Sequence, residues 1–384
     1  MPQPVITGGK NTRNITQNRL VIDMSNDIGL LKPDDAALLS FLKLAKHKSQ
    51  TATNPKFEWM EDGLAPRWDA INMGAGAASG VTSLIVANGD YFSVNDIIKV
   101  PRTGEVLLVT AVVTNTLTVV RGYGVTTSAA LVDKDPLVII GNVNEEFATL
   151  RTMKTTGLTP MFNYTQIWRT PFGVSRTAQK TKLYGQTELA YQQMKKGIEH
   201  KKDIERSLIF GERKEDTTGP HPKRATGGML SFLTANNYDA GGALTQTEFD
   251  NNVSESIFKY GSKEKILYSS ARLLSVINGW AMNKLEIDLE AKKFGLSVFK
   301  YITPFGNYNI INGMHTLEGA VYGGYGIVID PENIKYRPLE GGDTKLKTNI
   351  QDNSADGRID EYLTEGGLEV RNKETHAVIT GITS

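Results

Sequence analysis

Residues 82–124 read TSLIVANGDYFSVNDIIKVPRTGEVLLVTAVVTNTLTVVRGYG, a series of short β-patterned runs separated by turn signals. Within them, Glu105–Val113 and Thr116–Arg121 flank Thr114-Asn115, which is the pattern of a β-hairpin. The wider segment 81–141 contains no Cys, His or Trp, and its charges are scattered. This part of the chain therefore predicts a small β module that lacks a reaction centre.

Glycine-rich and aromatic stretches border the module. GAGAASG at 74–80 predicts a flexible joint before it, and Gly141-Asn142 closes it. Outside these joints lie FEWMEDGLAPRWDAIN (57–72) and NEEFATLRTMKTTGLTPMFNYTQIWRTPFGVS (144–175), which we interpret as extended segments broken by turns. Together they predict the two legs of a long hairpin whose tip has been replaced by the module.

The strongest helical pattern follows the second leg. Gln186–Arg213 predicts a helix of roughly 35 Å, with Thr187 near its start and Gly211 where it stops. A shorter amphipathic helix is predicted over 34–47, and another from the capping-box signature Thr245–Glu248 to Gly261. Residues 298–312 predict a hairpin that turns at 304–307, and the last strands return towards the C-terminus, so the fold class is α+β.

Length and composition limit the function classes. A chain of 384 residues exceeds one ordinary core and predicts two or three subdomains. The formal net charge of +1 argues against a strongly basic nucleic-acid binder, and the absence of Cys removes disulfides and thiolate chemistry. Without a signal-type or membrane-spanning apolar stretch, the sequence predicts a soluble protein that is not secreted.

No motif predicts catalysis, a cofactor or a metal site. The five histidines are dispersed, and neither a P-loop nor a GxSxG elbow occurs. We interpret His200 as lying on the solvated face of the long helix and His221 as part of a loose loop. The carboxylates Glu145, Glu146, Asp356, Asp360 and Glu361 are the candidates for paired acids, but we interpret them as surface groups.

The long helix and the residues after it carry equal numbers of bases and acids. This balance favours ion pairs and a solvated face over a grip on phosphate. The bases are Lys195, Lys196, Lys201, Lys202, Arg206, Arg213 and Lys214, and the acids are Glu188, Glu199, Asp203, Glu205, Glu212, Glu215 and Asp216. Only a weak, non-specific contact with DNA is expected.

The order of these segments resembles the tailed-bacteriophage major capsid protein family, which has the Johnson fold of the Hong Kong ninety-seven type. The resemblance covers roughly residues 56–384. It is carried by TGEVLLVTAVVTNTLTVVRGYG (103–124), NYTQIWRTPFGVS (163–175), ELAYQQMKKGIEHKKDIERSLIFGE (188–212), RATGGMLSF (224–232) and EGGLEVRNKETHAVITGI (365–382). More specifically, the chain looks like a capsid protein with a small β-barrel-like domain inserted in its E-loop.

The resemblance implies a domain plan. Residues 1–55 would form the N-terminal arm, 56–75 and 143–177 the E-loop legs, and 76–142 the inserted β domain. The P domain would comprise 178–235 and 340–384 with its spine helix at about 186–211, and the A domain would comprise 236–339. Because the sequence begins at Met1, we expect no long N-terminal scaffold segment to be removed.

The resemblance also implies a function and partners. The protein would be a non-enzymatic major capsid protein that self-assembles into hexamers and pentamers of an icosahedral head enclosing double-stranded DNA. Its partners would be other copies, a portal, and decoration or scaffolding proteins, with no membrane and with assembly in the host cytoplasm. The legs would bury aromatic side chains between subunits, which makes Trp59, Trp68, Tyr164 and Trp168 the candidates for intersubunit contact.

Two other functions are compatible with the sequence. The chain resembles other virion components, such as tail, baseplate or decoration proteins, in carrying a small β module. A carbohydrate-binding protein that uses the β module is the third hypothesis.

Overall fold

The computed structural model describes residues 36–44, 50–280, 285–286 and 299–383, and it divides into two compact units. Met1–Trp59 and Met161–Ser384 form one of them, which we call the main unit. Met60–Pro160 forms the other, which we call the inserted unit because its residues interrupt the main unit in the sequence.

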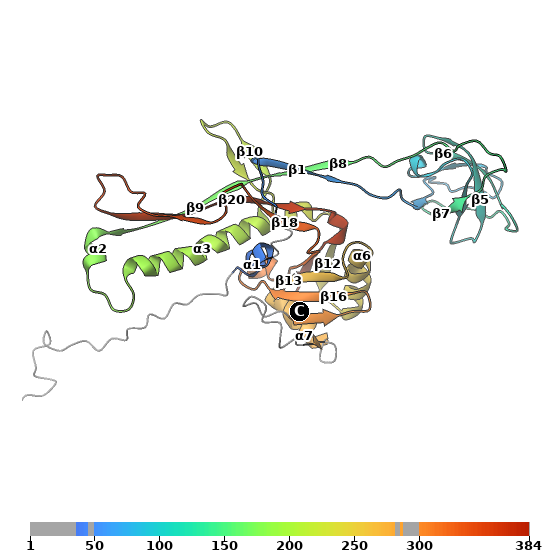
Figure 1. Ribbon diagram of the computed structural model, residues 1–384. Coiled ribbons are helices and arrows are strands. Elements are labelled where there is room, and N and C mark those ends of the chain that lie inside the picture. Colours follow the sequence, from blue (N-terminus) through green and yellow to red (C-terminus); the bar gives the residue numbers. More distant parts are fainter. Residues whose placement is uncertain (1–35, 45–49, 281–284, 287–298, 384) are drawn as a thin grey trace, which may run out of the picture. The chain divides into compact units, whose positions relative to one another are not determined.

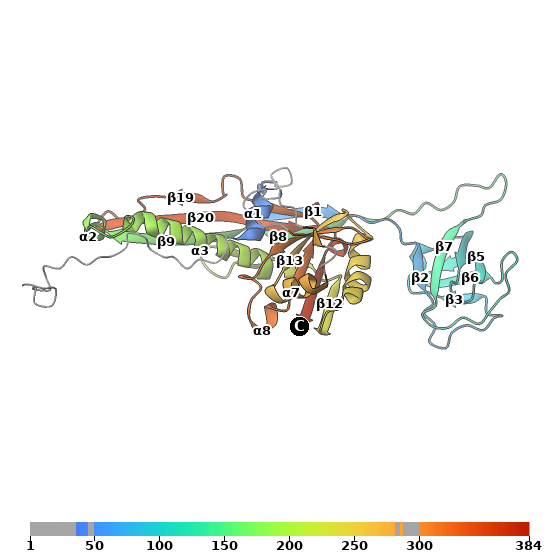
Figure 2. The ribbon, with the colours of Figure 1, turned by 90° about the horizontal axis from the view of Figure 1, so that it is seen from below.

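A six-stranded antiparallel sheet with the order β2-β7-β4-β5-β6-β3 forms the inserted unit. Its elements are β2 (Trp68–Ala70), β3 (Ser83–Ile85), η2 (Gly89–Tyr91), β4 (Asp96–Lys99), β5 (Val106–Val113), β6 (Thr116–Val120) and β7 (Pro136–Asn142). Hydrogen bonds from Asn72 N to Ile85 O (2.8 Å) and from Ala87 N to Ala70 O (3.0 Å) join the two edges of the sheet. The sheet is thereby closed into a small barrel, as predicted (Figure 2).

The predicted hairpin supplies side chains to the core of this barrel, because every second residue of its strands points inward. Leu107 and Val109 on β5 are buried beside Leu117 and Val119 on β6, while the residues between them are more exposed. Thr114 occupies the turn between the two strands with φ +50°. The hairpin prediction is therefore confirmed.

One salt bridge fixes the loop that follows β6. Glu105 is 1% exposed and accepts two hydrogen bonds of 2.8 Å from Arg121, one from Nε and one from Nη2. It also accepts hydrogen bonds from the backbone N–H groups of Gly122 and Ala129. Burial by itself raises the pKa of Glu105, but the hydrogen bonds from Arg121, Ala129 and Gly122 outweigh it and hold the pKa below its ordinary value.

A long helix lies along an antiparallel sheet in the main unit (Figures 1 and 2). The helix is α3 (Glu188–Phe210), which confirms the prediction for 186–213. The sheet contains β9 (Gln166–Ser175), β18 (Ile334–Pro338), β19 (Lys345–Lys347) and β20 (Gly357–Val370). β20 pairs with β9 over ten residues, from Gly357 opposite Ser175 to Gly366 opposite Gln166. α3 is thereby supported along most of its length by one continuous strand pair.

The second sheet of the main unit has seven strands in the order β12-β21-β17-β13-β16-β15-β14. They are β12 (Asn237–Gly242), β13 (Glu264–Ser269), β14 (Leu285–Glu286), β15 (Phe299–Ile302), β16 (Asn307–Asn312), β17 (Gly326–Ile329) and β21 (Ala377–Ile382). The β15–β16 pair confirms the predicted hairpin, and two pairs in the sheet, β12–β21 and β13–β16, are parallel.

Helical turns pack beside this second sheet. The capping box at Thr245 and Glu248 begins α5 (Gln246–Glu248), as predicted, and the helix continues through a π-helical turn, η3 (Phe249–Ser254), into α6 (Glu255–Phe258). α7 (Ala271–Trp280) buries Leu273 and Ile277. Phe249 lies at the centre of this core, with Tyr308, Trp280 and Tyr301 around its ring.

The remaining elements are short. They are α1 (Ala37–Leu44), β1 (Lys56–Glu61), β8 (Thr159–Tyr164), α2 (Arg176–Lys180), β10 (Lys214–Asp216), β11 (Lys223–Ala225), α4 (Met229–Phe232), α8 (Gly319–Tyr322) and η5 (Lys373–Thr375). α1 falls within the helix predicted over 34–47, whose two ends lie outside the described residues, as does most of the predicted N-terminal arm. β1 pairs with β8, so the two predicted legs do run side by side there.

Candidate assembly surfaces and the sites that hold them

The contact between α3 and the β9–β20 pair contains a buried histidine. His200 is 1% exposed, and its ring nitrogens lie 2.8 Å from Thr170 Oγ1 on β9 and 2.7 Å from Thr364 Oγ1 on β20. The prediction of a solvated position for His200 is therefore wrong. The spacing of the apolar residues along α3 could not predict this burial, because the β9–β20 pair covers a wider part of the helix surface than the apolar stripe.

The hydroxyl directions define which nitrogen of His200 carries the proton. Thr364 Oγ1 donates to Thr344 Oγ1, so it accepts from His200 Nε2–H, and Nδ1 accepts from Thr170 Oγ1–H. Burial lowers the pKa of His200, which keeps the ring neutral. This histidine therefore joins the helix to both strands as a neutral connector.

Two of the carboxylates that we interpreted as surface groups are buried. Asp360 is 1% and Glu361 is 2% exposed, and each is paired with an arginine, Arg358 and Arg169 respectively. That part of the prediction is wrong. Asp360 and Glu361 are consecutive on β20 and point to opposite faces, so packing on both faces of the strand, which no local pattern reveals, removes them from water. Glu145, Glu146 and Asp356 are exposed, as expected. The Arg169–Glu361 pair joins β9 to β20, whereas the Arg358–Asp360 pair lies within β20. Both carboxylates are thus engaged and neither is free for acid–base chemistry.

A second buried cluster lies between the seven-stranded sheet and the loops beside it. Lys265 and Asp330 are both fully buried, with Nζ 2.8 Å from Oδ2. Asp330 also accepts hydrogen bonds from Ser262, Glu332 N and Asn333 Nδ2. Burial alone raises the pKa of Asp330, but the hydrogen bonds from Lys265 and its neighbours outweigh it and lower the pKa. Burial likewise lowers the pKa of Lys265, against the opposing effect of Asp330.

His376 completes this cluster as a neutral base. Its Nδ1 accepts a hydrogen bond from Asp330 N (3.0 Å), so Nε2 carries the proton and donates to Arg371 O (3.1 Å). Burial lowers the pKa of His376 to about 4. Protonation of Nδ1 would remove its acceptor and place a charge in the core.

We expect acid to destabilise the subunit through His376. Its pKa is about 6.5 in an unfolded chain and lower when folded, so its contribution is complete above pH 6.5 and is lost as the pH falls towards 4. The loss should reach about 3 kcal/mol at pH 4. Urea unfolding of the unassembled subunit at pH 7 and pH 4 measures it. In His376→Asn, whose Oδ1 can still accept from Asp330 N, the decrease should be smaller by that amount, and equal decreases in both proteins would contradict the assignment.

α3 also anchors the N-terminal helix. Glu205 is 3% exposed, and its Oε2 accepts from Leu39 N at the start of α1 (3.1 Å). Its Oε1 accepts from Tyr268 OH (2.7 Å) and Thr316 Oγ1 (3.1 Å). One carboxylate thus connects α1, α3 and β13. The sequence placed Glu205 among the acids of a solvated face, and for this residue that prediction is wrong.

Two of the four predicted contact aromatics are covered by their own chain. Trp59 is 4% exposed and packs beside Phe57 and Phe232, with ring centroids 6.2 and 6.0 Å away. Trp168 is 6% exposed and donates from Nε1 to Ser207 Oγ on α3. Both side chains belong to the largest hydrophobic cluster of the main unit. Their burial therefore does not require a neighbouring subunit.

The other two retain accessible surface. Trp68 is 58% exposed on β2, where it lies opposite Val138 on the barrel. Tyr164 is half-buried at the end of β8, with its ring edge-on to Phe162. These two positions remain candidates for contact between copies.

A larger apolar surface was missed by the sequence reasoning. Residues 144–158 form no helix or strand, and Phe147, Leu150 and Met153 are almost completely exposed. Leu64, on the other leg, is equally exposed. Large apolar side chains gathered on an extended segment mark an interaction surface. The sequence does contain a signal for this surface, since residues 143–158 include apolar side chains that follow neither a helix nor a strand period.

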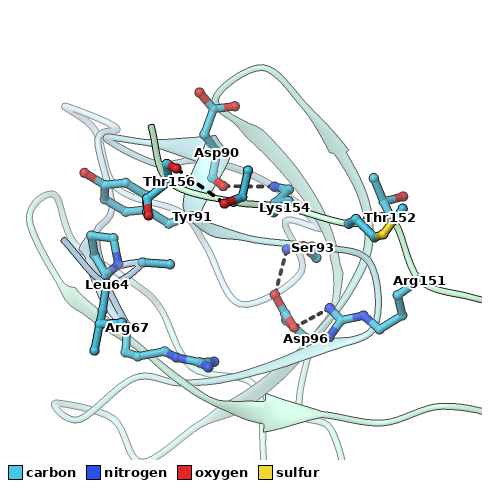
Figure 3. A pocket seen from close by; sticks show the side chains of 14 residues that line it. Leu64, Arg67, Asp90, Tyr91, Ser93, Asp96, Arg151, Thr152, Lys154 and Thr156 are labelled. Carbon is cyan, nitrogen blue, oxygen red and sulfur yellow. Dashed lines mark hydrogen bonds and ion pairs between the residues drawn. The ribbon is translucent and has the colours of Figure 1, made fainter. Parts of the chain in front are cut away.

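The legs and the barrel of the inserted unit enclose an open cleft of about 870 Å³ (Figure 3). Leu64–Arg67 form one side, 151–156 form the other, and Tyr91, Ser93 and Asp96 contribute from the barrel. Two cations fasten the second side to the barrel. Arg151 bonds to Asp96 (2.7 Å), and Lys154 Nζ donates to the backbone oxygens of Asp90 and Phe92.

Across the described residues, no group of three or more His, Cys, Asp or Glu side chains is placed to hold a metal ion. Within the same residues, no helix has both the length and the apolar character needed to cross a membrane.

A solved phage structure has a similar fold. No curated protein sequence matches the chain. A structure from Mycobacterium phage Bobi is 8% identical and covers 95% of this chain and 96% of its own, with a TM-score of 0.51. The capsid of a native GTA particle is 10% identical (97% and 98% covered, TM-score 0.49), as is a structure from Mycobacterium phage Cain (97% and 98%, TM-score 0.48).

The family model described as "SU10 major capsid protein" matches residues 6–383, which is nearly the whole chain. This match confirms the prediction of a major capsid protein that forms the capsid shell of the virion, with the α+β phage capsid fold. The chain belongs to the SU10 major capsid protein family.

Proposed function

We propose that this capsid protein builds hexamers and pentamers of an icosahedral phage head around double-stranded DNA, and that it has no enzymatic activity. The observation that carries the proposal is the family match over residues 6–383. The arrangement of α3 on the β9–β20 pair supports it, because a long helix fixed along a strand pair by buried polar contacts makes a rigid body suited to a shell.

The domain plan is part of this proposal. Residues 56–75 and 143–177 are assigned to the E-loop legs, 76–142 to the inserted β domain and 1–55 to the N-terminal arm. The P domain takes 178–235 and 340–384 with α3 as spine helix, and the A domain takes 236–339. The pairing of β1 with β8 supports the legs, and the seven-stranded sheet, most of whose strands lie in 236–339, supports the A domain.

Contacts between copies are assigned to the exposed parts of the legs and barrel. Trp68, Tyr164 and the apolar residues of 144–158 offer surface that the chain leaves uncovered. Obligate interfaces bury on the order of 2,000 Å² or more, and an extended segment supplies such an area without enlarging the fold. We assign the principal subunit contacts to these segments.

Other partners follow from the same role. A portal and decoration or scaffolding proteins would bind the shell, and assembly would take place in the host cytoplasm. Contact with packaged DNA would be weak and non-specific, because the chain has a net charge of only +1 and its acids and bases are interspersed on α3.

Electron microscopy of the expressed protein tests the proposal. Closed shells or isolated hexamers and pentamers are expected. A protein that remains monomeric at high concentration, or that forms only fibres, would contradict it. Deletion of 76–142 should alter particle stability without removing an activity, because the barrel contributes contact surface and no reactive group.

We expect Trp68→Ala to weaken assembly while leaving the fold intact. Its side chain is exposed on the barrel, so the free energy of unfolding should change by less than about 1 kcal/mol. Removal of an aromatic from an interface centre commonly costs 2 kcal/mol or more, so the concentration needed for assembly should rise at least tenfold. Light scattering against subunit concentration measures the shift. Trp59→Ala is the contrasting variant, since it should destabilise the subunit itself.

A further inference from the structure

Phe147 has an unusual conformation for an aromatic residue. Its φ is +62° and its side chain is fully exposed. Left-handed backbone in a bulky residue is rare and costs of order 1–3 kcal/mol, and such strain gathers at functional positions. Within the described chain no contact of the Phe147 ring accounts for the strain. The two preceding residues, Glu145 and Glu146, are exposed and have no ion-pair partner among the described residues.

The cleft of the inserted unit is basic, in contrast to the acidic residues that precede Phe147. Arg67 lines it and has no ion-pair or hydrogen-bond partner for its guanidinium among the described residues (Figure 3). In the part of the chain that the structure describes, Arg151 Nε is buried there without a hydrogen-bond partner, and Lys154 bonds only to carbonyl oxygens. Asp96 is already paired with Arg151. The lining thus holds three cations, Arg67, Arg151 and Lys154, against two acids, Asp90 and Asp96, which leaves a net positive charge beside the apolar wall of Leu64, Ala65, Pro66 and the Tyr91 ring.

We propose that the acidic-aromatic loop Glu145–Phe147 of one copy binds in this cleft of a second copy. Phe147 would pack against the wall formed by Leu64, Pro66 and Tyr91. Glu145 and Glu146 would pair with Arg67 and with the exposed part of the Arg151 side chain, which is 32% accessible. The contact joins the unpaired acids of one chain to the unpaired cation of another, and it gives the strained aromatic a place to be buried.

The position of the loop favours a two-fold arrangement. Phe147 precedes Arg151 by four residues, so loop and cleft lie within about 15 Å of each other on one unit. Two units related by a two-fold axis can then exchange loops, each giving its own and receiving the other's. This inference rests on the proposed function in one respect, which is that assembly of the shell brings two copies into contact.

Disulfide trapping tests the contact directly, because the natural chain has no cysteine. Ala148→Cys leaves Phe147 in place, and Leu64→Cys puts the second thiol on the wall of the cleft. Assembled shells of the double variant should, after mild oxidation, give at least tenfold more covalent dimer on a non-reducing gel than a matched control. The control pairs Ala148→Cys with Val125→Cys, which is fully exposed on the inserted unit and does not line the cleft.

Charge exchange shows whether the proposed pairing holds the loop. In the trapping background, Arg67→Glu should reduce the dimer at least fivefold, and adding Glu145→Arg and Glu146→Arg should restore it. Phe147→Ala should also reduce it, whereas Arg176→Glu, at an exposed arginine of the main unit, should not. Equal dimer in all of these variants would overturn the proposal.

The outcomes separate this inference from the proposed function. Shells that give no more dimer than the control overturn the loop exchange and leave the capsid function intact. An intrachain bond between positions 64 and 148, found by peptide mass analysis in the absence of dimer, also overturns it, because the loop would then occupy its own cleft. If the unsubstituted chain forms no shells or capsomers, the proposed function itself fails.

Discussion

Asp330→Ala should lower the free energy of unfolding by about 3–5 kcal/mol, which is one of the two largest effects that we expect from a single substitution in this protein. The substitution leaves Lys265 charged and fully buried, and the hydrogen bonds from Ser262, Glu332 N and Asn333 lose their acceptor. The interaction between opposite charges in a low dielectric is what offsets their desolvation, so removing one member is far worse than removing both.

Urea unfolding of the unassembled subunit at pH 7 measures this effect. The matched control is Asp356→Ala, which breaks an Arg–Asp pair of similar length whose side chains are 74% and 66% exposed. Exposed pairs contribute little, so this variant should unfold close to the parent. The double variant Lys265→Met with Asp330→Ala should recover part of the stability, because no unpaired charge remains. Equal effects of Asp330→Ala and Asp356→Ala would contradict the account.

Glu205→Ala is expected to cost about 4 kcal/mol and to free α1 from the main unit. Three donors lose the same acceptor, namely Leu39 N, Tyr268 OH and Thr316 Oγ1. An unsatisfied buried donor costs about 1–3 kcal/mol, and the charge of the carboxylate strengthens each bond that is lost. Local unfolding of α1 should therefore accompany the loss of global stability.

Hydrogen exchange of the α1 amides, together with urea unfolding, measures both parts. Glu205→Gln separates them, since its oxygen can serve Tyr268 and Thr316 while its amide nitrogen cannot accept from Leu39 N. That variant should exchange faster in α1 with a smaller global loss. Glu199→Ala is the control on the same helix, where the carboxylate is 41% exposed and is paired with Lys196. Unchanged exchange in α1 for both Glu205 variants would refute the anchoring role.

Local patterns in the sequence were sufficient for much of the fold. The β5–β6 hairpin, the capping box at Thr245 and the extent of α3 depend on residues close together in the chain, so turn and cap chemistry specifies them directly. The pairing of β1 with β8, about a hundred residues apart, was predicted from the similar character of the two legs. Each of these features can be recognised without knowing what packs on it.

The buried polar residues could not be recognised in that way. His200, Glu205, Asp360 and Lys265 look like surface residues in the sequence, and it is distant strands and helices that remove them from water. Charged side chains are buried only when paired, and their partners lie far along the chain, as Asp330 does from Lys265. For Trp59 and Trp168 the sequence did not reveal the partners within the chain, which are Phe232 in α4 and Ser207 in α3.

The closure of the barrel has a consequence for how this capsid protein can change. β2 and β7, its first and last strands, are neighbours, with Trp68 opposite Val138, so the chain enters and leaves the barrel at adjacent points. All of its core residues come from within the inserted unit. A short turn could therefore replace the barrel, or another closed domain could be grafted there, at the entropic cost of an ordinary loop. The inserted unit is therefore a place where this chain could gain or exchange a surface while the main unit keeps its own core.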